Sequence, residues 1–312
     1  MSTSTSSDRR TVLVTGATGN QGGAVIDEII AAGKADELNL LAVTRNTESN
    51  GAKKLVSKAP QSIKLVQGDM NDCASLFGSI KEPIHSVFCV SIPAMGFGAK
   101  EGAEEITANA LIDAAHENGV KHFVFTSVDR HGAESDSIDT ECPHFISKAK
   151  IERHLKQKFS GPDHSWTILR PVAFMENITT GFAGKIFPTA WQVGLPSSTK
   201  LQVVSTKDIG WFGAQALLRP KDFAGRAVSL AGDELTFEQA NAIFQREAGI
   251  EIPTTYGFLA SFLLWAISDV GLMFKFFETK GYAADIEALK KEHPGLRSLE
   301  DWVKSSPFAT KK

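Results

Sequence analysis

The sequence is poor in features that define several large classes of protein. It has three cysteines in 312 residues, Cys73, Cys89 and Cys142, and no Cys-x-x-Cys or Cys/His metal spacing. A sparse, odd set argues against a disulfide framework or a metal site and fits a reducing compartment. The formal net charge of −3 provides no basic face for direct binding of nucleic acid. We therefore expect a cytoplasmic protein, with the nucleus left open, that does not bind nucleic acid directly.

Long apolar runs are also missing. The most apolar stretch covers residues 258–267 and is interrupted by Ser268-Asp269, so it is too short to cross a bilayer. We expect a buried or interface helix there and no membrane partner. Residues 1–10 are rich in Ser and Thr and lack the apolar segment of a signal peptide, which predicts a short disordered tail.

Glycine is concentrated near the start of the chain. The run Thr11-Val12-Leu13-Val14-Thr15 leads into Gly16, Gly19 and Gly22 at the spacing GxxGxxG, and a helical pattern follows at once. Such a turn directs backbone N–H groups and a helix N-terminus at one point, which favours a bound phosphate. Glycines also serve ordinary turns, but a position between strand and helix predicts a dinucleotide site. The side chains that can add donors around the pyrophosphate are Thr18, Asn20 and Gln21.

The alternation of strand and helix repeats through residue 171. We expect strands at 11–15, 38–44, 63–67, 87–91, 120–127 and 166–170, and helices at 21–32, 51–59, 72–81, 100–118 and 143–159. Parallel strands need such helical crossovers, so the predicted fold class is α/β, a doubly wound parallel sheet of the Rossmann type. The helix over 100–118 is expected to turn Ile106, Ala110, Leu111 and Ala114 inward.

After Pro171 strands and helices no longer alternate regularly. Strands are expected at 201–204 and 227–230, a helix at 237–247, and short helices at 283–291 and 299–303. We predict a tail (1–10), a Rossmann domain (11–171, rejoined by 201–231) and a smaller, mostly helical lobe (172–200 and 232–312). Open α/β sheets bind ligands at the carboxyl edge of the strands, where the lobe is expected to form a substrate or effector pocket. The aromatic residues of 256–277 favour a pocket that excludes water, and the loop over 93–98 is placed to cover a ligand.

The end of the second strand distinguishes NAD from NADP. An NAD site usually places a carboxylate there for the ribose 2′-hydroxyl, whereas an NADP site places an arginine. The chain reads Thr44-Arg45-Asn46 and has no acidic residue until Glu48. Arg45 offers a forked, charged donor set for a 2′-phosphate and a flat face for adenine, the alternative being an ordinary surface arginine. We predict NADP(H), with Asn46 in the same site.

Further candidates follow the third and fourth strands. Asp69, followed by Met70, either accepts a hydrogen bond from the adenine amine or serves as a turn residue. Val90 and Ser91 end the fourth strand and are expected near the nicotinamide-side ribose.

The catalytic candidates lie four residues apart on the helix over 143–159. Residues i and i+4 share a helical face, so His144 and Lys148 can point at one bound group. Lys148 is expected to hold the nicotinamide ribose, and His144 can donate a proton near neutral pH. The alternative for His144 is a residue at a helix start without a chemical role. Cys142 has no base partner and is interpreted as incidental.

Taken together, these residues resemble the NmrA-like family, an atypical branch of the short-chain dehydrogenase/reductase superfamily. The resemblance implies that the turn from Gly16 to Gly22 and Arg45 hold NADP, that Asp69 lies near the adenine and that Lys148 approaches the nicotinamide ribose. It also implies that the segment around Pro171, with Asn177, flanks the nicotinamide. The motifs that carry it are Val14-Thr15-Gly16-Ala17-Thr18-Gly19-Asn20-Gln21-Gly22, Thr44-Arg45-Asn46, Gln67-Gly68-Asp69, Phe125-Thr126-Ser127-Val128, His144-Phe145 with Lys148 and Glu152, Leu169-Arg170-Pro171 with Glu176-Asn177, Met273-Phe274-Lys275-Phe276 and Leu299-Glu300-Asp301-Trp302.

The chain departs from the superfamily at one position. Active members carry Tyr-x-x-x-Lys, but His144 stands at the place of the tyrosine, and the only tyrosines are Tyr256 and Tyr282. Two functions therefore stay open. One is an NADPH-dependent oxidoreductase that transfers hydride to a small, fairly apolar substrate. The other is a redox sensor that binds NADP(H) without chemistry and regulates a protein partner such as a transcription factor; a homodimer also stays open.

Overall fold

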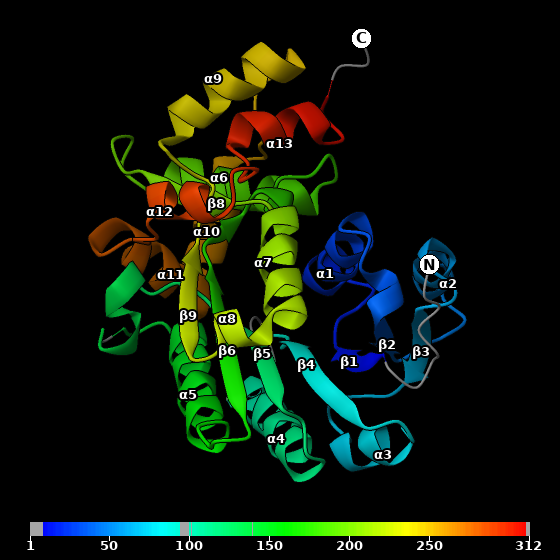
Figure 1. Cartoon of the computed structure of the whole chain (residues 1–312). Coiled ribbons are helices and arrows are strands. Elements are labelled where there is room, and N and C mark those ends of the chain that lie inside the picture. The colour runs from blue at the N-terminus through cyan, green and yellow to red at the C-terminus, as the bar shows by residue number, and fades with distance from the viewer. Residues whose placement is uncertain (1–8, 94–99, 101, 139, 310–312) are drawn as a thin grey trace.

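The structure, a computed structural model, describes residues 9–93, 100, 102–138 and 140–309. Its centre is a seven-stranded parallel sheet with the strand order β3-β2-β1-β4-β5-β6-β9, flanked by helices on both faces (Figure 1). This is the predicted Rossmann-like α/β fold. The strands are Arg10–Val14 (β1), Leu38–Thr44 (β2), Ile63–Gln67 (β3), Ile84–Val90 (β4), His122–Thr126 (β5), Ser165–Pro171 (β6) and Arg226–Leu230 (β9).

The six strands predicted before residue 172 are all confirmed, and their ends differ from the prediction by at most three residues. β1 begins at Arg10, which was assigned to the tail; its guanidinium donates to the backbone carbonyls of Leu217 and Leu218. The strand order reverses direction between β1 and β4, and ligands of open α/β sheets bind at such a switch point.

Successive residues of β1 face opposite layers of the molecule. Val12 and Val14 pack in one core cluster and Leu13 in another, because side chains alternate along a strand. The first cluster is covered by α1 (Asn20–Ala31), α2 (Asn50–Lys58) and α7 (Thr206–Leu218), and the second by α3 (Cys73–Gly78), α4 (Ala103–Glu117) and α5 (Pro143–Lys158). α1 and α7 lie side by side (Figure 1). They approach so closely that a Cβ on Gly210 would lie 2.6 Å from the backbone carbon of Ala24.

The face that α4 turns inward differs from the prediction. Of the four residues expected inside, only Leu111 is buried; Ile106 is 70% exposed and Ala110 is also exposed. The buried positions are Glu104, Ala108, Leu111, Ile112 and Ala115. The prediction failed because it counted only apolar residues, whereas the inner face of this helix begins with a carboxylate.

A second, three-stranded sheet has the order β10-β8-β7. Its strands are Ala173–Phe174 (β7), Leu201–Val204 (β8) and Asp233–Leu235 (β10). Of the two strands predicted within 201–231, β9 therefore lies in the large sheet and β8 does not. The remaining helices are α6 (Ile186–Gly194), α8 (Pro220–Phe223), α9 (Phe237–Ala248), α10 (Gly257–Ala266), α11 (Ser268–Thr279), α12 (Ile286–Glu292) and α13 (Leu299–Ser305), with short 3₁₀ turns at Ala35–Glu37, Gly132–Asp136, Met175–Asn177 and Ala183–Lys185.

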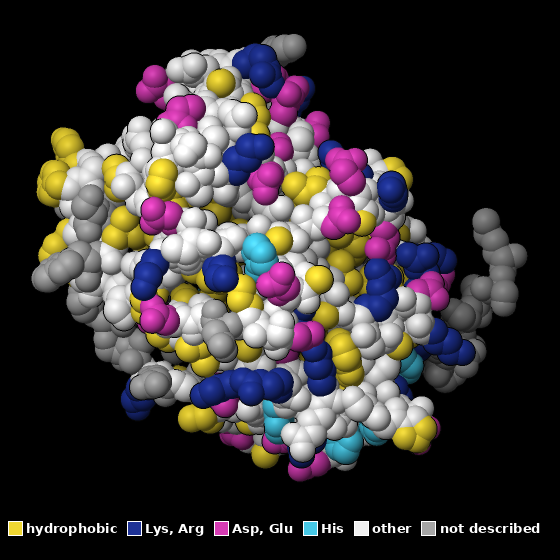
Figure 2. Space-filling model, turned by 90° about the vertical axis from the view of Figure 1, so that its left-hand side faces the viewer, with side chains coloured by type: hydrophobic (Ala, Val, Ile, Leu, Met, Phe, Trp, Pro, Cys, Tyr) yellow, Lys and Arg dark blue, Asp and Glu magenta, His cyan; other side chains and the backbone are white. Residues whose placement is uncertain are grey.

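The helices after residue 232 do not form a fully separate body. α9 and α13 lie together at one end of the molecule, but Leu289 of α12 packs in the same core cluster as β1 (Figure 1). In the described part of the chain, no helix combines the length and apolarity of a membrane span. On the face seen in Figure 2, acidic and basic side chains are interspersed and apolar side chains gather along one edge.

Candidate functional site

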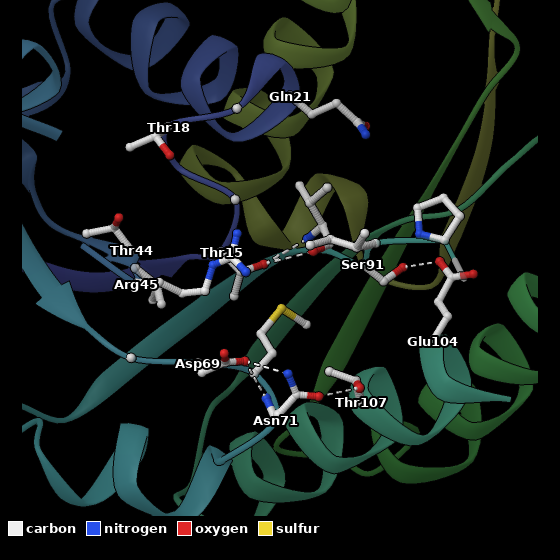
Figure 3. Close-up of a pocket in the computed structure, with 18 of the residues that line it drawn as sticks. Thr15, Thr18, Gln21, Thr44, Arg45, Asp69, Asn71, Ser91, Glu104 and Thr107 are labelled. Atoms are coloured by element: carbon white, nitrogen blue, oxygen red, sulfur yellow. Dashed lines mark hydrogen bonds between the residues drawn. The ribbon is translucent and has the colours of Figure 1, made fainter. Parts of the chain in front are cut away.

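A cavity of about 720 Å³ lies at the carboxyl ends of β1, β2, β3 and β4 (Figure 3). Its volume is within the range of small-molecule and cofactor sites, about 300–1,000 Å³. The cavity is lined by most of the residues predicted to bind a dinucleotide: Gly16, Thr18, Gly19, Asn20, Gln21, Arg45, Asn46, Asp69, Met70, Val90 and Ser91. These residues come from four separate loops, which the parallel sheet brings to one edge.

The glycine turn closes over the end of β1 in a way that side chains would prevent. Gly16 has a φ of +60°, in the left-handed region. A Cβ on Gly22 would lie 2.5 Å from the carbonyl oxygen of Gly16, so Gly22 allows α1 to pack on the turn. Gly22 is not among the residues that line the cavity, and its contact with a ligand stays a prediction. Thr15 fixes the turn to β4, because its hydroxyl accepts a hydrogen bond of 2.9 Å from the Val90 N–H.

The N-terminus of α1 faces this cavity without a side-chain cap. Gly19 occupies the cap position and has no side chain to accept the first amides of the helix. The side chain of Gln21 contributes an oxygen, Oε1, that is buried and has no hydrogen-bond partner among the described residues. Uncapped amides at a helix N-terminus attract an anion or another acceptor.

Arg45 directly follows β2 and points into the cavity (Figure 3). Within the described residues it has no ion-pair partner within 4.0 Å. Glu48, the first carboxylate after β2, is instead paired with Lys53 at 2.9 Å. Among the described residues that line the cavity, Arg45 is the one with a positively charged side chain, so its guanidinium is available to an anionic group of a ligand.

Asp69 forms the turn that follows β3. Its Oδ1 accepts hydrogen bonds from the backbone and side-chain N–H groups of Asn71, at 2.9 and 2.8 Å. Thr107 of α4 donates to Asn71 at 3.2 Å and ties this turn to the helix. The turn role weighed for Asp69 is present, and its contact with adenine stays a prediction.

The opposite end of the cavity carries a buried cluster of charged groups. Glu104 on the first turn of α4 and Ser91 after β4 line the cavity, and Lys148 of α5 lies behind them. Lys148 Nζ is 2.7 Å from Ser91 Oγ, 2.9 Å from Glu104 Oε1 and 3.1 Å from the Thr126 carbonyl oxygen. Glu104 and Lys148 are each only 4% exposed. A lysine and a carboxylate that are buried to this extent form an ion pair whose charges cancel, since an isolated buried charge would be costly.

Glu104 is held in its ionised form by its neighbours. Burial alone would raise its pKa, but a contact with His144, the positive charge of Lys148 and the hydroxyl of Ser91 outweigh burial and lower the pKa to about 2. The His144 contact is long: Nδ1 lies 3.5 Å from Glu104 Oε2 and has no hydrogen-bond partner among the described residues. We therefore attribute the lowered pKa chiefly to Lys148 and Ser91, which are in hydrogen-bond contact with the carboxylate.

His144 and Lys148 do point at one group, as their spacing predicts, but that group is Glu104. Neither residue is among those that line the cavity, and their direct contact with the cofactor stays a prediction. Glu104 is not predicted from the sequence, because its partners Ser91 and Lys148 follow β4 and lie on α5. A buried acid at the start of α4 is indicated only by the pair Glu104-Glu105, which equally describes a solvated helix start.

Two further predicted ligands also lie outside the cavity. Pro171 is buried at the end of β6, where its carbonyl accepts from the Asp129 N–H at 3.0 Å, and Asn177 is exposed. Phe174 of β7 lines the cavity in their place. Of the loop expected to cover a ligand, Pro93 lines the cavity, and residues 94–98 lie outside the described residues. Other lining residues that the prediction did not include are Thr15, Val43, Thr44, Gly68, Asn71, Ile92, Ala103 and Thr107.

Comparison with known proteins identifies the family. Residues 8–302 match the model of the NmrA-like family. An NmrA-like family domain-containing protein of Dictyostelium discoideum is 26% identical over 309 residues, covering 94% of this chain and 96% of that protein. An NmrA-like family domain-containing oxidoreductase of Aspergillus versicolor is 29% identical over 171 residues, 45% of this chain and 44% of that protein.

Solved structures with the same fold include an enzyme and a regulator. The triphenylmethane reductase of Citrobacter sp., complexed with NADP(H), has a TM-score of 0.70 at 18% identity and covers 95% of this chain and 99% of its own. NmrA, a negative transcriptional regulator in complex with NADP, has a TM-score of 0.66 at 17% identity and covers 95% of each chain. At such identities the structures establish the fold alone. The match of the family model over nearly the whole sequence shows that the chain belongs to the NmrA-like family.

Proposed function

We propose that this chain binds NADP(H) in the cavity and transfers hydride from it to a small, fairly apolar substrate. One observation carries the proposal: a single cavity connects an anion-seeking end, formed by the glycine turn and Arg45, with an end lined by Ser91, Glu104, Ile92 and Phe174. The first end suits a dinucleotide with an additional phosphate. The second combines a charge-neutral polar wall with apolar side chains.

The residues present fit such a cofactor. The turn around Gly16 leaves the α1 amides uncapped, Gln21 Oε1 is buried without a partner among the described residues, and Arg45 faces the cavity unpaired within them. The turn amides would bind the pyrophosphate and Arg45 the 2′-phosphate. Asp69 would lie near the adenine, and Val90 and Ser91 near the nicotinamide half. When bound and reduced, the nicotinamide supplies a hydride.

The side chains at the second end would position the reactants and exclude water. Because Glu104 cancels the charge of Lys148, this end favours a neutral, apolar group over an anion. Lys148 acts on the ligand through Ser91, whose hydroxyl it touches at 2.7 Å. A proton, where the substrate requires one, would come from solvent or by way of His144.

The proposal is tested in two steps. Fluorescence titration should show saturable binding of NADPH, with NADH binding at least about tenfold more weakly because it lacks the phosphate partner of Arg45. The complex is then mixed with aldehydes, ketones, enones, imines and cationic dyes, and NADPH oxidation is followed at 340 nm. Absence of NADPH binding would refute the proposed cofactor. Binding without turnover of any substrate would refute the reductase but leave the cofactor.

The second candidate, a sensor that binds NADP(H) and regulates a protein partner, is favoured by one observation. Among the described residues, the side chains at the Ser91 end of the cavity include no tyrosine, and those of Lys148 and Ser91 have their hydrogens directed at other protein atoms. A sensor should change its oligomeric state or its capture of a partner when NADP replaces NADPH. Size-exclusion chromatography with light scattering, with either nucleotide and with neither, measures the first of these changes.

A further inference from the structure

We propose that the outer face of α10 is a contact between two copies of this chain, so that the protein is a homodimer. This face consists of Val193, Tyr256, Phe258 and Phe262, which we call the α10 patch. The exposed fractions of these side chains are 44%, 72%, 69% and 54%. None of the four is among the residues that line the cavity, so the proposed contact does not depend on a bound nucleotide.

The side chains of the α10 patch lie next to one another. The rings of Tyr256 and Phe258 are stacked, with their centroids 5.7 Å apart. Phe262 follows Phe258 by four residues on α10, which places it on the same face of the helix, one turn further along. Val193, near the end of α6, borders the start of α10, because a Cβ on Gly257 would lie 3.4 Å from Val193 Cγ1. The patch is therefore one continuous apolar surface.

The inner side of α10 is packed against the rest of the molecule. Leu264, two residues after Phe262 and so on the other side of the helix, packs against the core cluster that contains Trp191 and Phe274. A Cβ on Gly194 would lie 3.0 Å from Leu264 Cδ1. α10 also lies beside α6 and α11 (Figure 1). These contacts hold the helix in place with its aromatic side chains turned outward, so the patch is already formed in a single copy.

The size of the α10 patch is suited to one half of a dimer interface. A fully buried aromatic side chain covers about 150–250 Å², so the three aromatic residues together expose about 300–500 Å² at these fractions. Each partner of a standard interface contributes about 800 Å², of which a little more than half is apolar. The patch thus supplies most of the apolar area that each copy has to contribute.

The absence of charge favours a second copy over other partners. Residues 186–194 and 252–268 contain no Lys, Arg, Asp or Glu. In a two-fold contact the same surface occurs on both sides, so charges at its centre would face like charges, whereas an uncharged surface avoids this repulsion. A basic partner would instead be recognised by acidic side chains, and an anionic membrane by Lys and Arg. Glu251 and Asp269, which border the uncharged run, would repel such a membrane.

Sedimentation velocity of the whole chain without nucleotide tests the contact. We expect the wild type to form dimers between about 1 and 100 μM. Phe258→Asp or Tyr256→Asp should weaken dimerisation at least about a hundredfold, because a two-fold contact contains each substitution twice and one aromatic anchor is typically worth about thirtyfold. Ile106→Asp is the matched control, since Ile106 is 70% exposed but lies on α4. It should dimerise like the wild type.

The results distinguish the α10 patch from other contacts. A wild type that is monomeric at every concentration would overturn the proposal, and its sedimentation with phosphatidylcholine vesicles would identify a lipid surface as the occupant. A dimer that persists in both aromatic variants, or is lost in Ile106→Asp, would place the contact elsewhere and also overturn the proposal. Circular dichroism melts establish that each variant is folded, and if one aromatic variant is not, the other decides. NADPH binding is measured separately, so the proposed cofactor does not depend on these results.

Discussion

Replacing Glu104 by glutamine should destabilise the protein in a manner that depends on pH. The pKa of this carboxyl is about 2, against 4.5 for a free glutamate. At about 1.4 kcal/mol for each pKa unit, the ionised Glu104 stabilises the folded state by about 3 kcal/mol. This stabilisation is similar in size to the roughly 3–5 kcal/mol lost when one partner of a buried ion pair is removed.

The sign of the pH dependence follows from the lowered pKa. The stabilisation is fully present above pH 4.5, the range in which the unfolded chain also ionises this group, and it is lost as the pH falls toward 2. By pH 3, about 2 kcal/mol of it should be gone. Once protonated, Glu104 resembles the amide of Glu104→Gln in shape and charge. The difference in unfolding free energy between wild type and variant (the gap) should therefore narrow by about 2 kcal/mol between pH 7 and pH 3.

Urea denaturation followed by circular dichroism at pH 3, 4, 5 and 7 measures the gap. Other carboxyls also lose stabilising charge in acid, but they do so in both proteins and cancel in the difference. Glu105→Gln serves as the control. The Glu105 carboxylate is partly exposed and paired with Lys150, so the difference in unfolding free energy between this variant and the wild type should stay within about 0.5 kcal/mol at every pH. A gap for Glu104→Gln that does not change between pH 3 and pH 7 would refute the reasoning.

Three further predictions concern the cofactor site and the thiols. Arg45→Ala should weaken NADPH binding by about tenfold or more and leave NADH binding within about twofold, while Arg153→Ala on the surface of α5 changes neither; titration measures both. Gly22→Ala should destabilise the protein by about 1–3 kcal/mol, because its Cβ would lie 2.5 Å from the Gly16 carbonyl oxygen. In the control Gly23→Ala, where the nearest atom is 3.4 Å away, a thermal melt should show no loss. Burial raises the pKa of the Cys142 thiol to about 11, so iodoacetamide at pH 8 should label it only after unfolding, as read by mass spectrometry.

Local patterns predicted the parts of the site that depend on neighbouring residues in the chain. The glycine turn follows β1 and Arg45 follows β2, so each can be recognised from the residues next to it in the chain. The parallel sheet then brings the two strand ends to one edge. Glu104 could not be predicted in this way, since its partners Ser91 and Lys148 lie 13 and 44 residues away and only the fold joins them. The same limitation explains β8: its apolar residues indicate a strand, but not which of two sheets it joins.

The apolar character of the proposed substrate rests on different residues from those that first suggested it. The aromatic residues of 256–277 were expected to enclose a pocket, yet Tyr256 and Phe258 are 72% and 69% exposed, and the cavity is lined by Phe174 instead. The stronger reason is electrostatic. Lys148 alone would draw an anion to this end of the cavity, but Glu104 at 2.9 Å cancels its charge and turns the Ser91 hydrogen away from the ligand. This chain has His144 at the place of the superfamily's tyrosine, and its cavity ends beside a Lys148–Glu104 pair whose charges cancel, so we expect its choice of ligand to depend on Glu104 as much as on Lys148.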